Sequence, residues 1–347
     1  MAVRLRDVAE QAGVSVKTVS NVVNGYAHVS PEMRARVQAV LDRTGYRPNL
    51  AARNLRAGRT GVIALALPEL DNPYFAELTR SVVEAAQKHN LTVLVDQTDG
   101  LREREVDASA GFRHNLIDGL IISPVGLGAD DLARHDVASI PLVLLGEKVA
   151  NWSADHVAID NVAAARLATE HLLGLGRTCV AALGHQPDSS RESGVASLRR
   201  QGWDEALRAA ELVPHEAWVA EVPRFGRSDG AEAMARLLDG PEPVDAVFCF
   251  NDTLALGALR LLSERGLRVP EDVAVIGLDN IEEGRYSVPT LSTVAPAKDE
   301  IGRTAVRMLV ERLEQHTDDL APRDVRAGFE LVARESTLGR VSASAGS

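Results

Sequence analysis

Residues 8–25 read VAEQAGVSVKTVSNVVNG, and this stretch contains two short amphipathic helix patterns on either side of Gly13. Ala9 and Gly13 are small where two helices would have to cross closely, and Ser15 can cap the second helix. The stretch therefore predicts a helix-turn-helix unit. On its own it fits two interpretations: a helical hairpin with a solvated face, or a helix pair whose second member reads base edges in DNA.

The polar face of the second helix and the charge of the chain help to decide between these interpretations. Val16, Lys17, Ser20 and Asn21 are predicted to point outward near the N-terminal half of this helix, the part that reaches base edges in the major groove. The 347-residue chain has a formal net charge of −11, yet residues 1–60 hold ten Lys or Arg and four Asp or Glu. A basic segment on an acidic body is expected of a polyanion-binding unit joined to a soluble domain. The DNA interpretation is therefore favoured over a solvated face.

The rest of the N-terminal region predicts a third helix and a basic connecting segment. The third helix begins with Ser30 as its N-cap and ends before Gly45. Residues 46–60 read YRPNLAARNLRAGRT, of which only about seven have helical character, and so short a helix is marginal in water because nucleation is costly. We expect this segment to order only when something holds it. The predicted helices lie at 5–12, 16–24 and 31–44.

From Gly61 onward the pattern changes to alternating strands and helices. The strands are apolar runs without alternation, such as VIALALP at 62–68 and AVFCFN at 246–251. Such runs indicate parallel strands that are buried on both faces and covered by helices. Roughly nine or ten strand–helix repeats are too many for one small open sheet. They predict an α/β body of two lobes, each a parallel sheet covered by helices.

Patterns typical of enzymes, metal sites and membrane proteins are missing from the sequence. GLGADD at 126–131 and GLGRTC at 174–179 lack the third glycine of a dinucleotide-binding loop. The nine His residues have no metal-ligand spacing, and no nucleophile-elbow or Walker sequence occurs. The N-terminus has no apolar signal-peptide segment, and no run of 18 apolar residues is present. We expect a cytoplasmic, non-enzymatic protein without cofactor or metal.

Polar side chains follow several of the predicted strands of the body. Ser123, Asp160, Asn251 and Asp279 each stand at the carboxyl end of an apolar run. Charged groups there are costly unless they are paired or functional, and ligands of open α/β sheets bind at this edge. A ligand site is one interpretation. A helix N-cap is the other, above all for Asp252.

The order of these segments resembles the lactose-repressor/purine-repressor family of bacterial transcription regulators. The resemblance is most specific in RLRDVAEQAGVSVKTVSNVVNG and in HVSPEMRARVQAVLDRTGYRPNLAARNLRAGRTGVIALALP. It continues to about residue 338 through LDNPYF, HVAIDN, LRRQGW, FNDTLALG and VIGLDN. It implies a helix-turn-helix headpiece and a hinge helix, joined to a two-lobed body like that of periplasmic sugar-binding proteins, with ligand in the cleft between the lobes.

The resemblance implies DNA contacts in the headpiece and the hinge. Lys17 and Asn21 match sequence-reading positions, where they can donate to guanine and pair with adenine, and Val16 can touch a thymine methyl group. Leu55 matches the hinge-helix leucine that wedges into the minor groove at the centre of a near-palindromic operator; its alternative is packing against the body. The implied DNA contacts are Val16, Lys17, Thr18, Ser20, Asn21, Tyr26, His28, Arg34, Arg53, Leu55 and Arg56.

The resemblance also implies an effector site in the cleft of the body. Arg199, Asn251 and Asp279 match polar effector contacts of the family, and an arginine with a carboxylate suits vicinal hydroxyl groups. Three aromatic side chains match walls on which a ring face could lie. The candidate effector residues are Tyr74, Phe75, Ser123, Asp160, Arg199, Phe225, Asn251 and Asp279.

The chain departs from the family pattern at two places. Gly146, followed by Glu147, stands where the lactose repressor has an acidic residue at the end of its fourth strand. Ser193 stands near the position of an additional arginine of the purine repressor. The first departure puts one effector contact in doubt, and the second disfavours a guanine-type ligand. A sugar or sugar derivative is the predicted effector.

We therefore predict a ligand-responsive repressor that binds a near-palindromic double-stranded DNA operator as a homodimer and has no membrane partner. The alternative is a stand-alone cytoplasmic sugar-binding protein whose headpiece does not bind DNA. The predicted domains are a headpiece at 1–45, a hinge at 46–60, an effector-binding and dimerisation domain at 61–340 and a disordered tail at 341–347. The N-terminal lobe is predicted at about 61–160 and 292–323, and the C-terminal lobe at about 161–291 and 324–340.

Overall fold

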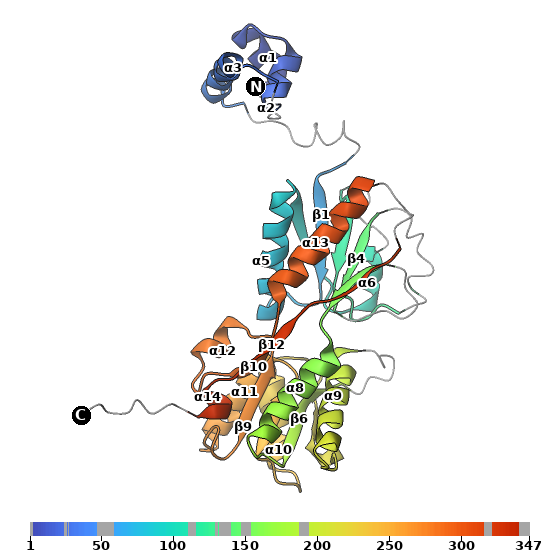
Figure 1. The fold of residues 1–347 in the computed structure, drawn as a ribbon, viewed down its shortest axis with the longest axis vertical. Helices are drawn as coiled ribbons and strands as arrows, with labels where there is room; N and C mark the ends of the chain where they lie inside the picture. Colours follow the sequence, from blue (N-terminus) through green and yellow to red (C-terminus); the bar gives the residue numbers. More distant parts are fainter. Residues whose placement is uncertain are drawn as a thin grey trace, which may run out of the picture. The chain divides into compact units, whose positions relative to one another are not determined.

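The chain folds as two compact units, Met1–Gly61 and Val62–Ser347, which are described separately. The first holds the helical headpiece and the second the α/β body (Figure 1). None of the helices within the described ranges combines the length and the hydropathy that crossing a membrane requires. The computed structural model describes residues 3–23, 26, 28–46, 59–109, 116–128, 131, 140–146, 154–186, 194–315 and 321–339.

The headpiece consists of three helices around a small apolar core. The helices are α1 (Leu5–Ala12), α2 (Val16–Val23) and α3 (Pro31–Thr44). Gly13 adopts a φ of 63°, a left-handed conformation that glycine accepts without strain, and it ends α1. The hydroxyl groups of Ser15 and Ser30 accept hydrogen bonds from the backbone N–H groups of Thr18 and Met33, at 3.0 and 3.3 Å. These helices confirm the periodicity of the sequence. The core side chains are Val8, Ala9, Ala12, Val19, Val22, Val37, Val40 and Leu41.

The N-terminal lobe of the body is built on a parallel sheet with the strand order β11-β5-β4-β3-β1-β2. Side chains of β1 alternate between the two faces. Ile63 and Leu65 pack with α5 and α13, while Ala64 and Ala66 pack beside α6 on the other face. Burial on both faces explains the unbroken apolar runs. The elements are β1 (Val62–Leu67), α5 (Pro73–Lys88), β2 (Thr92–Gln97), α6 (Arg102–Ser109), β3 (Gly119–Ile122), β4 (Leu142–Leu145), β5 (Asp155–Ala158), α13 (Lys298–Gln315) and β11 (Asp324–Arg326).

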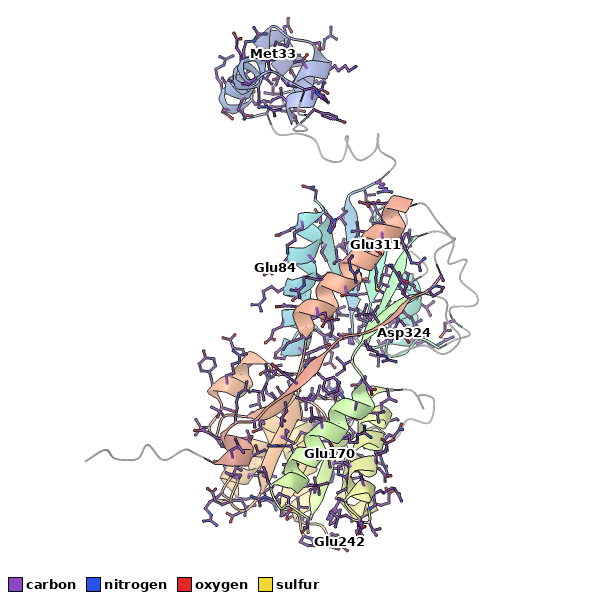
Figure 2. The ribbon with its side chains drawn as sticks, in the orientation of Figure 1. Met33, Glu84, Glu170, Glu242, Glu311 and Asp324 are labelled. Carbon is purple, nitrogen blue, oxygen red and sulfur yellow. The ribbon has the colours of Figure 1, made fainter. Side chains whose placement is uncertain are left out.

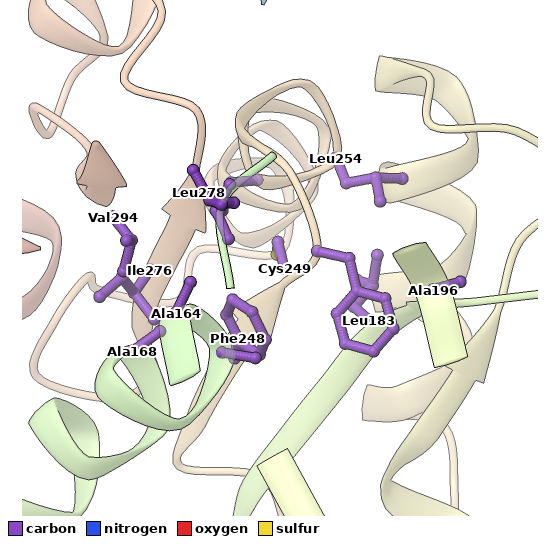
Figure 3. Close-up of a cluster of buried hydrophobic side chains, with 14 of the residues drawn as sticks. Ala164, Ala168, Leu183, Ala196, Phe248, Cys249, Leu254, Ile276, Leu278 and Val294 are labelled. Carbon is purple, nitrogen blue, oxygen red and sulfur yellow. The ribbon is translucent and has the colours of Figure 1, made fainter. Parts of the chain in front are cut away.

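The C-terminal lobe is built on a second sheet with the strand order β12-β10-β9-β8-β6-β7. Its ladders are parallel except for the antiparallel pairing of β10 with β12. Phe248 and Ile276 of its strands pack against Ala164 and Ala168 of α8 (Figure 3). The strands are β6 (Val180–His185), β7 (Val219–Glu221), β8 (Ala246–Cys249), β9 (Ala274–Leu278), β10 (Ser292–Pro296) and β12 (Phe329–Val332). The helices are α8 (Asn161–Gly174), α9 (Val195–Ala209), η2 (Glu216–Trp218), α10 (Arg227–Leu238), α11 (Asp252–Glu264), α12 (Glu282–Tyr286) and α14 (Glu335–Leu338).

Close helix packing in this lobe depends on glycine. A Cβ atom on Gly257 of α11 would lie 1.9 Å from the carbonyl oxygen of Arg227 in α10. A Cβ atom on Gly230 of α10 would lie 2.2 Å from the carbonyl oxygen of Leu254 in α11. Neither distance is compatible with a side chain, so the two backbones touch directly at these glycines.

The sheets correct two predicted crossings between the lobes. Residues 292–296 were expected in the N-terminal lobe, but they form β10 beside β9 in the C-terminal sheet. Residues 324–326 were expected in the C-terminal lobe, but they form β11 beside β5 in the N-terminal sheet. The sequence missed β11 because a three-residue edge strand reading DVR carries no apolar pattern.

A buried carboxylate joins three segments of the N-terminal lobe. Asp155 opens β5 and is fully buried. Its oxygens accept hydrogen bonds from Arg312 of α13 at 2.8 Å and from Arg323 at 2.7 Å. Burial acts to raise the pKa of Asp155, but the hydrogen bonds from these arginines outweigh it and lower the pKa to about 2. Figure 2 labels the neighbouring side chains Glu311, which pairs with Arg323, and Asp324.

Candidate functional site

The second helix of the headpiece presents the predicted polar face. Val16 is 44% exposed although it is apolar, and Lys17 beside it is also exposed. Val19 and Val22 of the same helix are buried in the core, which fixes the direction in which α2 presents its other side. An exposed valine and lysine at the start of a helix can approach base edges in a groove. Thr18, Ser20 and Asn21 are half-buried, and His28 is exposed.

Some of the predicted DNA contacts also stabilise the headpiece itself. The hydroxyl group of Thr18 is 2.8 Å from that of Ser15, at the cap of α2. Arg34 donates from Nη2 to the carbonyl oxygen of Tyr26 at 2.7 Å, and the Tyr26 side chain is 58% exposed. Arg34 therefore holds the peptide backbone at Tyr26. The other predicted contacts, Arg53, Leu55 and Arg56, lie outside the described residues.

The body contains a cavity of about 340 Å³ between the carboxyl ends of its two sheets. Residues after β1, β3 and β4 line it from the N-terminal lobe, and residues after β6, β8 and β9 line it from the C-terminal lobe. Carboxyl ends of parallel strands are the usual ligand-binding edge of an α/β sheet. The cleft brings together seven of the predicted effector residues, namely Tyr74, Phe75, Ser123, Arg199, Phe225, Asn251 and Asp279.

Asp160 was predicted as an effector contact, and the structure corrects this. Its side chain is exposed, and its Oδ1 accepts a hydrogen bond from the backbone N–H of Ala163 at 2.9 Å, so it is the N-cap of α8. The next residue, Asn161, lines the cleft instead. At this strand end the capping requirement of the helix determines where the carboxylate points.

Arg199 brings a positive charge to the cleft from α9. Its side chain is 8% exposed. Nε donates to Oδ1 of Asn161 at 3.0 Å, and Nη1 donates to the carbonyl oxygen of Phe250. Two hydrogen-bonded partners hold the planar guanidinium in one orientation, which is the requirement for directional recognition of a ligand.

Asp279 brings a carboxylate to the same cleft directly after β9. It is 6% exposed, and burial raises its pKa to about 7, with a further contribution from Asp252. The positive charges of Arg199 and Lys298 act in the opposite direction. Its backbone φ of 125° is unusual for a residue with a side chain. Buried ionisable groups and strained backbone are typical of functional sites.

Of the two residues that follow each other after β8, Asn251 caps the next helix and Asp252 connects that helix to neighbouring segments. Asn251 is the N-cap of α11, with Oδ1 2.9 Å from the backbone nitrogen of Leu254, and its amide group donates to Thr253 at 2.7 Å. The alternative interpretation of Asp252 as the N-cap of this helix is therefore wrong. Its buried carboxylate accepts from Thr293 at 2.7 Å and from the backbone N–H of Ile281 at 3.0 Å, and burial raises its pKa to about 6.

Aromatic side chains form part of the cleft wall in both lobes. Tyr74 and Phe75 come from the start of α5, with ring centroids 5.2 Å apart and an edge-to-face arrangement. Phe225 comes from the C-terminal lobe. Burial raises the pKa of Tyr74, with a further contribution from Asp279, so its hydroxyl group stays protonated and can donate.

Several cleft residues were missed by the sequence argument. Glu69 and Gln186 follow β1 and β6, so the rule that singled out Ser123 and Asp279 could have found them. Asn72 caps α5 before Pro73, the pattern that also marks the start of the third helix at Ser30, so its place at a helix start could have been predicted. Arg224 lies in a loop, for which the sequence offers no signal. Gly146 also lines the cleft, where a Cβ atom would lie 3.6 Å from Oγ of Ser123. Glu147 and Ser193 lie outside the described residues.

Comparison with known proteins assigns the chain to a family. Residues 4–49 match the family described as bacterial regulatory proteins, lacI family, and residues 169–337 match the periplasmic binding protein-like domain. The chain is 32% identical to the transcriptional repressor PurR of Haemophilus influenzae (strain PittEE) over 335 residues. This aligned region covers 96% of this chain and 98% of PurR. The chain belongs to the lacI family.

Two solved structures extend the similarity of this LacI-family protein to its fold. The lac repressor dimer bound to operator and the anti-inducer ONPF matches with a TM-score of 0.81 and 28% identity, over 97% of this chain and 100% of that chain. The complex of the regulator CelR with cellobiose matches with a TM-score of 0.70 and 32% identity, over 96% of this chain and 99% of that chain. Like its family, the protein is a DNA-binding transcriptional repressor with an effector-binding domain, and not an enzyme. The match over residues 4–49 contradicts the alternative of a headpiece that does not bind DNA.

Proposed function

We propose that this repressor binds a near-palindromic operator as a homodimer and that a sugar or sugar derivative in the cleft controls its affinity for DNA. The observation that carries the proposal is the cleft itself. It combines the carboxyl ends of both sheets with a fixed arginine, a buried carboxylate and aromatic walls. A ligand that touches both lobes can favour one relative position of the lobes over another.

The chemistry of the cleft supports a ligand rich in hydroxyl groups. Arg199 donates hydrogen bonds, the carboxylate of Asp279 accepts them, and adjacent hydroxyl groups of a sugar can satisfy both at once. Tyr74, Phe75 and Phe225 offer apolar surface to the C–H face of a sugar ring. The complex of CelR with cellobiose, a structure of the same fold, supports this choice of ligand class.

The headpiece supports sequence-specific binding through α2. Lys17 would donate to guanine, Asn21 would pair with adenine and Val16 would contact a thymine methyl group. Leu55 of the hinge segment would wedge into the minor groove at the centre of the operator. The operator complex of the lac repressor, which this chain matches over nearly its whole length, supports this arrangement.

Exposed apolar side chains support a homodimer. Tyr286 at the end of α12 and Val288 after it are 77% and 74% exposed, and Val95 on the edge strand β2 is 37% exposed. Large apolar side chains on a surface often mark an interface. A two-fold dimer would present two copies of α2 to the two halves of a palindrome. Sedimentation of the wild type and of Tyr286→Asp tests this, and a monomeric wild type would contradict it.

Control by the ligand follows from linkage between the cleft and the hinge. A hinge that becomes helical only when paired and docked makes its folding free energy part of the DNA affinity. A ligand that changes the relative position of the lobes then changes how the two hinges can pair. A typical coupling of ~1–3 kcal/mol changes operator affinity by roughly 5- to 150-fold.

A thermal-shift screen tests the ligand class. The protein is mixed in turn with cellobiose, ribose, other mono- and disaccharides, guanine and hypoxanthine. A ligand at 100 times its Kd should stabilise the body by ~2.7 kcal/mol. We expect a sugar to raise the melting temperature of the wild type and not that of Asp279→Ala. A shift with a purine base alone would contradict the sugar proposal.

A mobility-shift assay tests the DNA side without any ligand. Binding to random duplex DNA should weaken steeply as salt rises, because Lys and Arg of the headpiece displace counterions from phosphates. Binding of a truncated body that begins at residue 62 serves as the control. Equal binding by both proteins would contradict DNA recognition by the headpiece.

A further inference from the structure

The turn after β9 contains one backbone conformation, at Asp279, that a residue with a side chain does not favour. Asp279 has a φ of 125° and Asn280 a φ of 50°, so two consecutive residues with side chains lie at positive φ. Such a conformation persists only where surrounding groups hold it. The same turn carries the carboxylate of Asp279 in the cleft. What holds the turn therefore also determines where this carboxylate lies.

Groups of the C-terminal lobe hold one side of the turn. The backbone N–H of Asn280 donates to the hydroxyl oxygen of Thr293 at 3.2 Å, and that of Ile281 donates to Asp252 at 3.0 Å. Arg334 donates from Nη2 to Oδ1 of Asn280 at 2.7 Å. These partners belong to the same lobe as the turn and move with it.

Groups of the N-terminal lobe hold the other side. Lys298, the first residue of α13, donates from Nζ to the carbonyl oxygens of Asp279 at 2.7 Å and of Asn280 at 3.1 Å. The same ammonium group pairs with Glu77 of α5. Oε1 of Glu77 also accepts a hydrogen bond from the backbone N–H of Glu282 at 3.1 Å. Two side chains of one lobe thus bind three backbone groups of the other, the carbonyl oxygens of Asp279 and Asn280 and the N–H of Glu282.

Low exposure keeps these contacts strong, and the packing of α5 against α13 connects them to the rest of the N-terminal lobe. The side chain of Lys298 is 11% exposed and that of Glu77 is 23% exposed, and a shielded ion pair is weakened little by solvent and salt. The two helices that carry them run side by side in the N-terminal lobe (Figure 1). Ser81 of α5 donates to Asp299 of α13, and a Cβ atom on Gly302 would lie 2.8 Å from Cβ of Ser81. The helices therefore move as one body.

We propose that Glu77 and Lys298 form an interlobe bracket, a pair of positioning residues that fixes the Asp279 turn against α5 and α13 and sets the angle between the lobes. The position of the cleft carboxylate and the position of the N-terminal lobe then change together. The inference rests on the proposed function in one respect: the proposed function makes the Asp279 carboxylate the hydrogen-bond acceptor for the effector. The bracket itself consists only of groups of this chain.

The test measures the distance between the lobes in full-length protein without sugar or DNA. Nitroxide labels are placed at Glu84→Cys on α5 and Glu170→Cys on α8, which are exposed and lie in different lobes (Figure 2). Cys179, which is half-buried, is replaced by Ser, while Cys249 is buried and stays. Labelled protein is diluted with unlabelled protein so that electron–electron resonance reports pairs within one chain. Amide exchange of residues 279–284 is followed in the same variants.

The bracket variants are Lys298→Met, Glu77→Gln and their combination, and the matched controls are Lys88→Met and Glu314→Gln, two exposed residues of the same helices. We expect both single variants to broaden the interlobe distance distribution towards longer distances, the combination to add nothing further and the controls to match the wild type. Amide exchange at 279–284 should rise about tenfold, the factor that corresponds to ~1.4 kcal/mol.

Two results would overturn the proposal. One is an unchanged distance distribution in both Lys298→Met and Glu77→Gln, even with faster amide exchange, because the pair would then stabilise the turn only locally. The other is the same broadening in the control variants. Glu77→Gln keeps the acceptor for Glu282, so it remains informative if Lys298→Met fails to fold. A sugar screen without hits would contradict the proposed function and leave this result intact.

Discussion

Replacing Asp279 by Asn is expected to stabilise the effector-free body at neutral and alkaline pH. Burial raises the pKa of this carboxyl group to about 7, Asp252 and Glu77 add to the effect, and Arg199 and Lys298 oppose it. In the unfolded chain the pKa is near 4. Because the pKa is higher in the folded state, the stabilising contribution of Asp279 is complete below about pH 4 and is lost as pH rises through about 7.

The size of this effect follows from the difference between the two pKa values. About three pKa units correspond to ~4 kcal/mol, an upper limit for the free energy that the folded protein loses when this carboxyl group ionises. Asn has the same shape and no proton to lose, so Asp279→Asn removes the loss. Asn and Asp have the same branching, so the variant meets the φ of 125° at this position on the same terms as wild type. We expect Arg199 to keep its hydrogen bonds to Asn161 and Phe250 in the variant, because neither bond involves residue 279.

Urea unfolding at about pH 5 and about pH 8 measures the effect, with tryptophan fluorescence as the signal. All three tryptophans, at 152, 203 and 218, lie in the body, so the signal does not report the headpiece. We expect wild type to lose more free energy of unfolding between the two pH values than Asp279→Asn does. Glu314→Gln, an exposed control, should behave like wild type. Parallel pH dependence of wild type and Asp279→Asn would refute the reasoning, because ionisation of Asp279 would then cost nothing.

Three further variants test the packing, the buried ion pairs and the hinge. Gly257→Ala should destabilise the body by about 2 kcal/mol or more, since its Cβ would lie 1.9 Å from the carbonyl oxygen of Arg227. The control Gly174→Ala should not destabilise the body, because a Cβ there meets nothing within 4 Å. Equal urea midpoints of the two variants would contradict this. Asp155→Asn should lower the free energy of unfolding by about 3 kcal/mol at neutral pH, because it leaves two arginines without their carboxylate. Since the pKa of Asp155 is lowered to about 2, this difference should shrink as pH falls from about 4 towards 2, and a constant difference would argue against the ion pairs as its cause. Leu55→Ala should weaken binding to the specific operator far more than binding to random DNA in a mobility-shift assay, and equal losses would exclude the minor-groove wedge.

Much of the fold could be predicted because its signals are local. The caps at Ser15 and Ser30 and the periodicity of the three headpiece helices depend only on neighbouring residues. The buried parallel strands can be recognised in the sequence as unbroken apolar runs. Edge strand β11 could not be found, because its pairing with β5 depends on residues more than 160 positions away and not on its own composition.

The site could be predicted only as far as the topology dictates it. Residues after parallel strands converge at one edge, and this rule correctly brought Ser123, Asn251 and Asp279 to the cleft. The rule does not say which way a side chain points. Asp160 turns to cap its helix, and Asn161 takes the place in the cleft. The contacts of Lys298 to the Asp279 turn join two lobes and leave no trace in the sequence.

Operator affinity with and without a sugar tests the central claim most directly. Fluorescence anisotropy of labelled operator DNA is measured for wild type and for Asp279→Asn, each with and without a saturating amount of the sugar that raises the melting temperature of the wild type. We predict that the sugar changes the operator Kd of wild type by at least about fivefold and leaves that of Asp279→Asn unchanged. An operator affinity of wild type that is the same with and without the bound sugar would contradict control of the headpiece by the cleft.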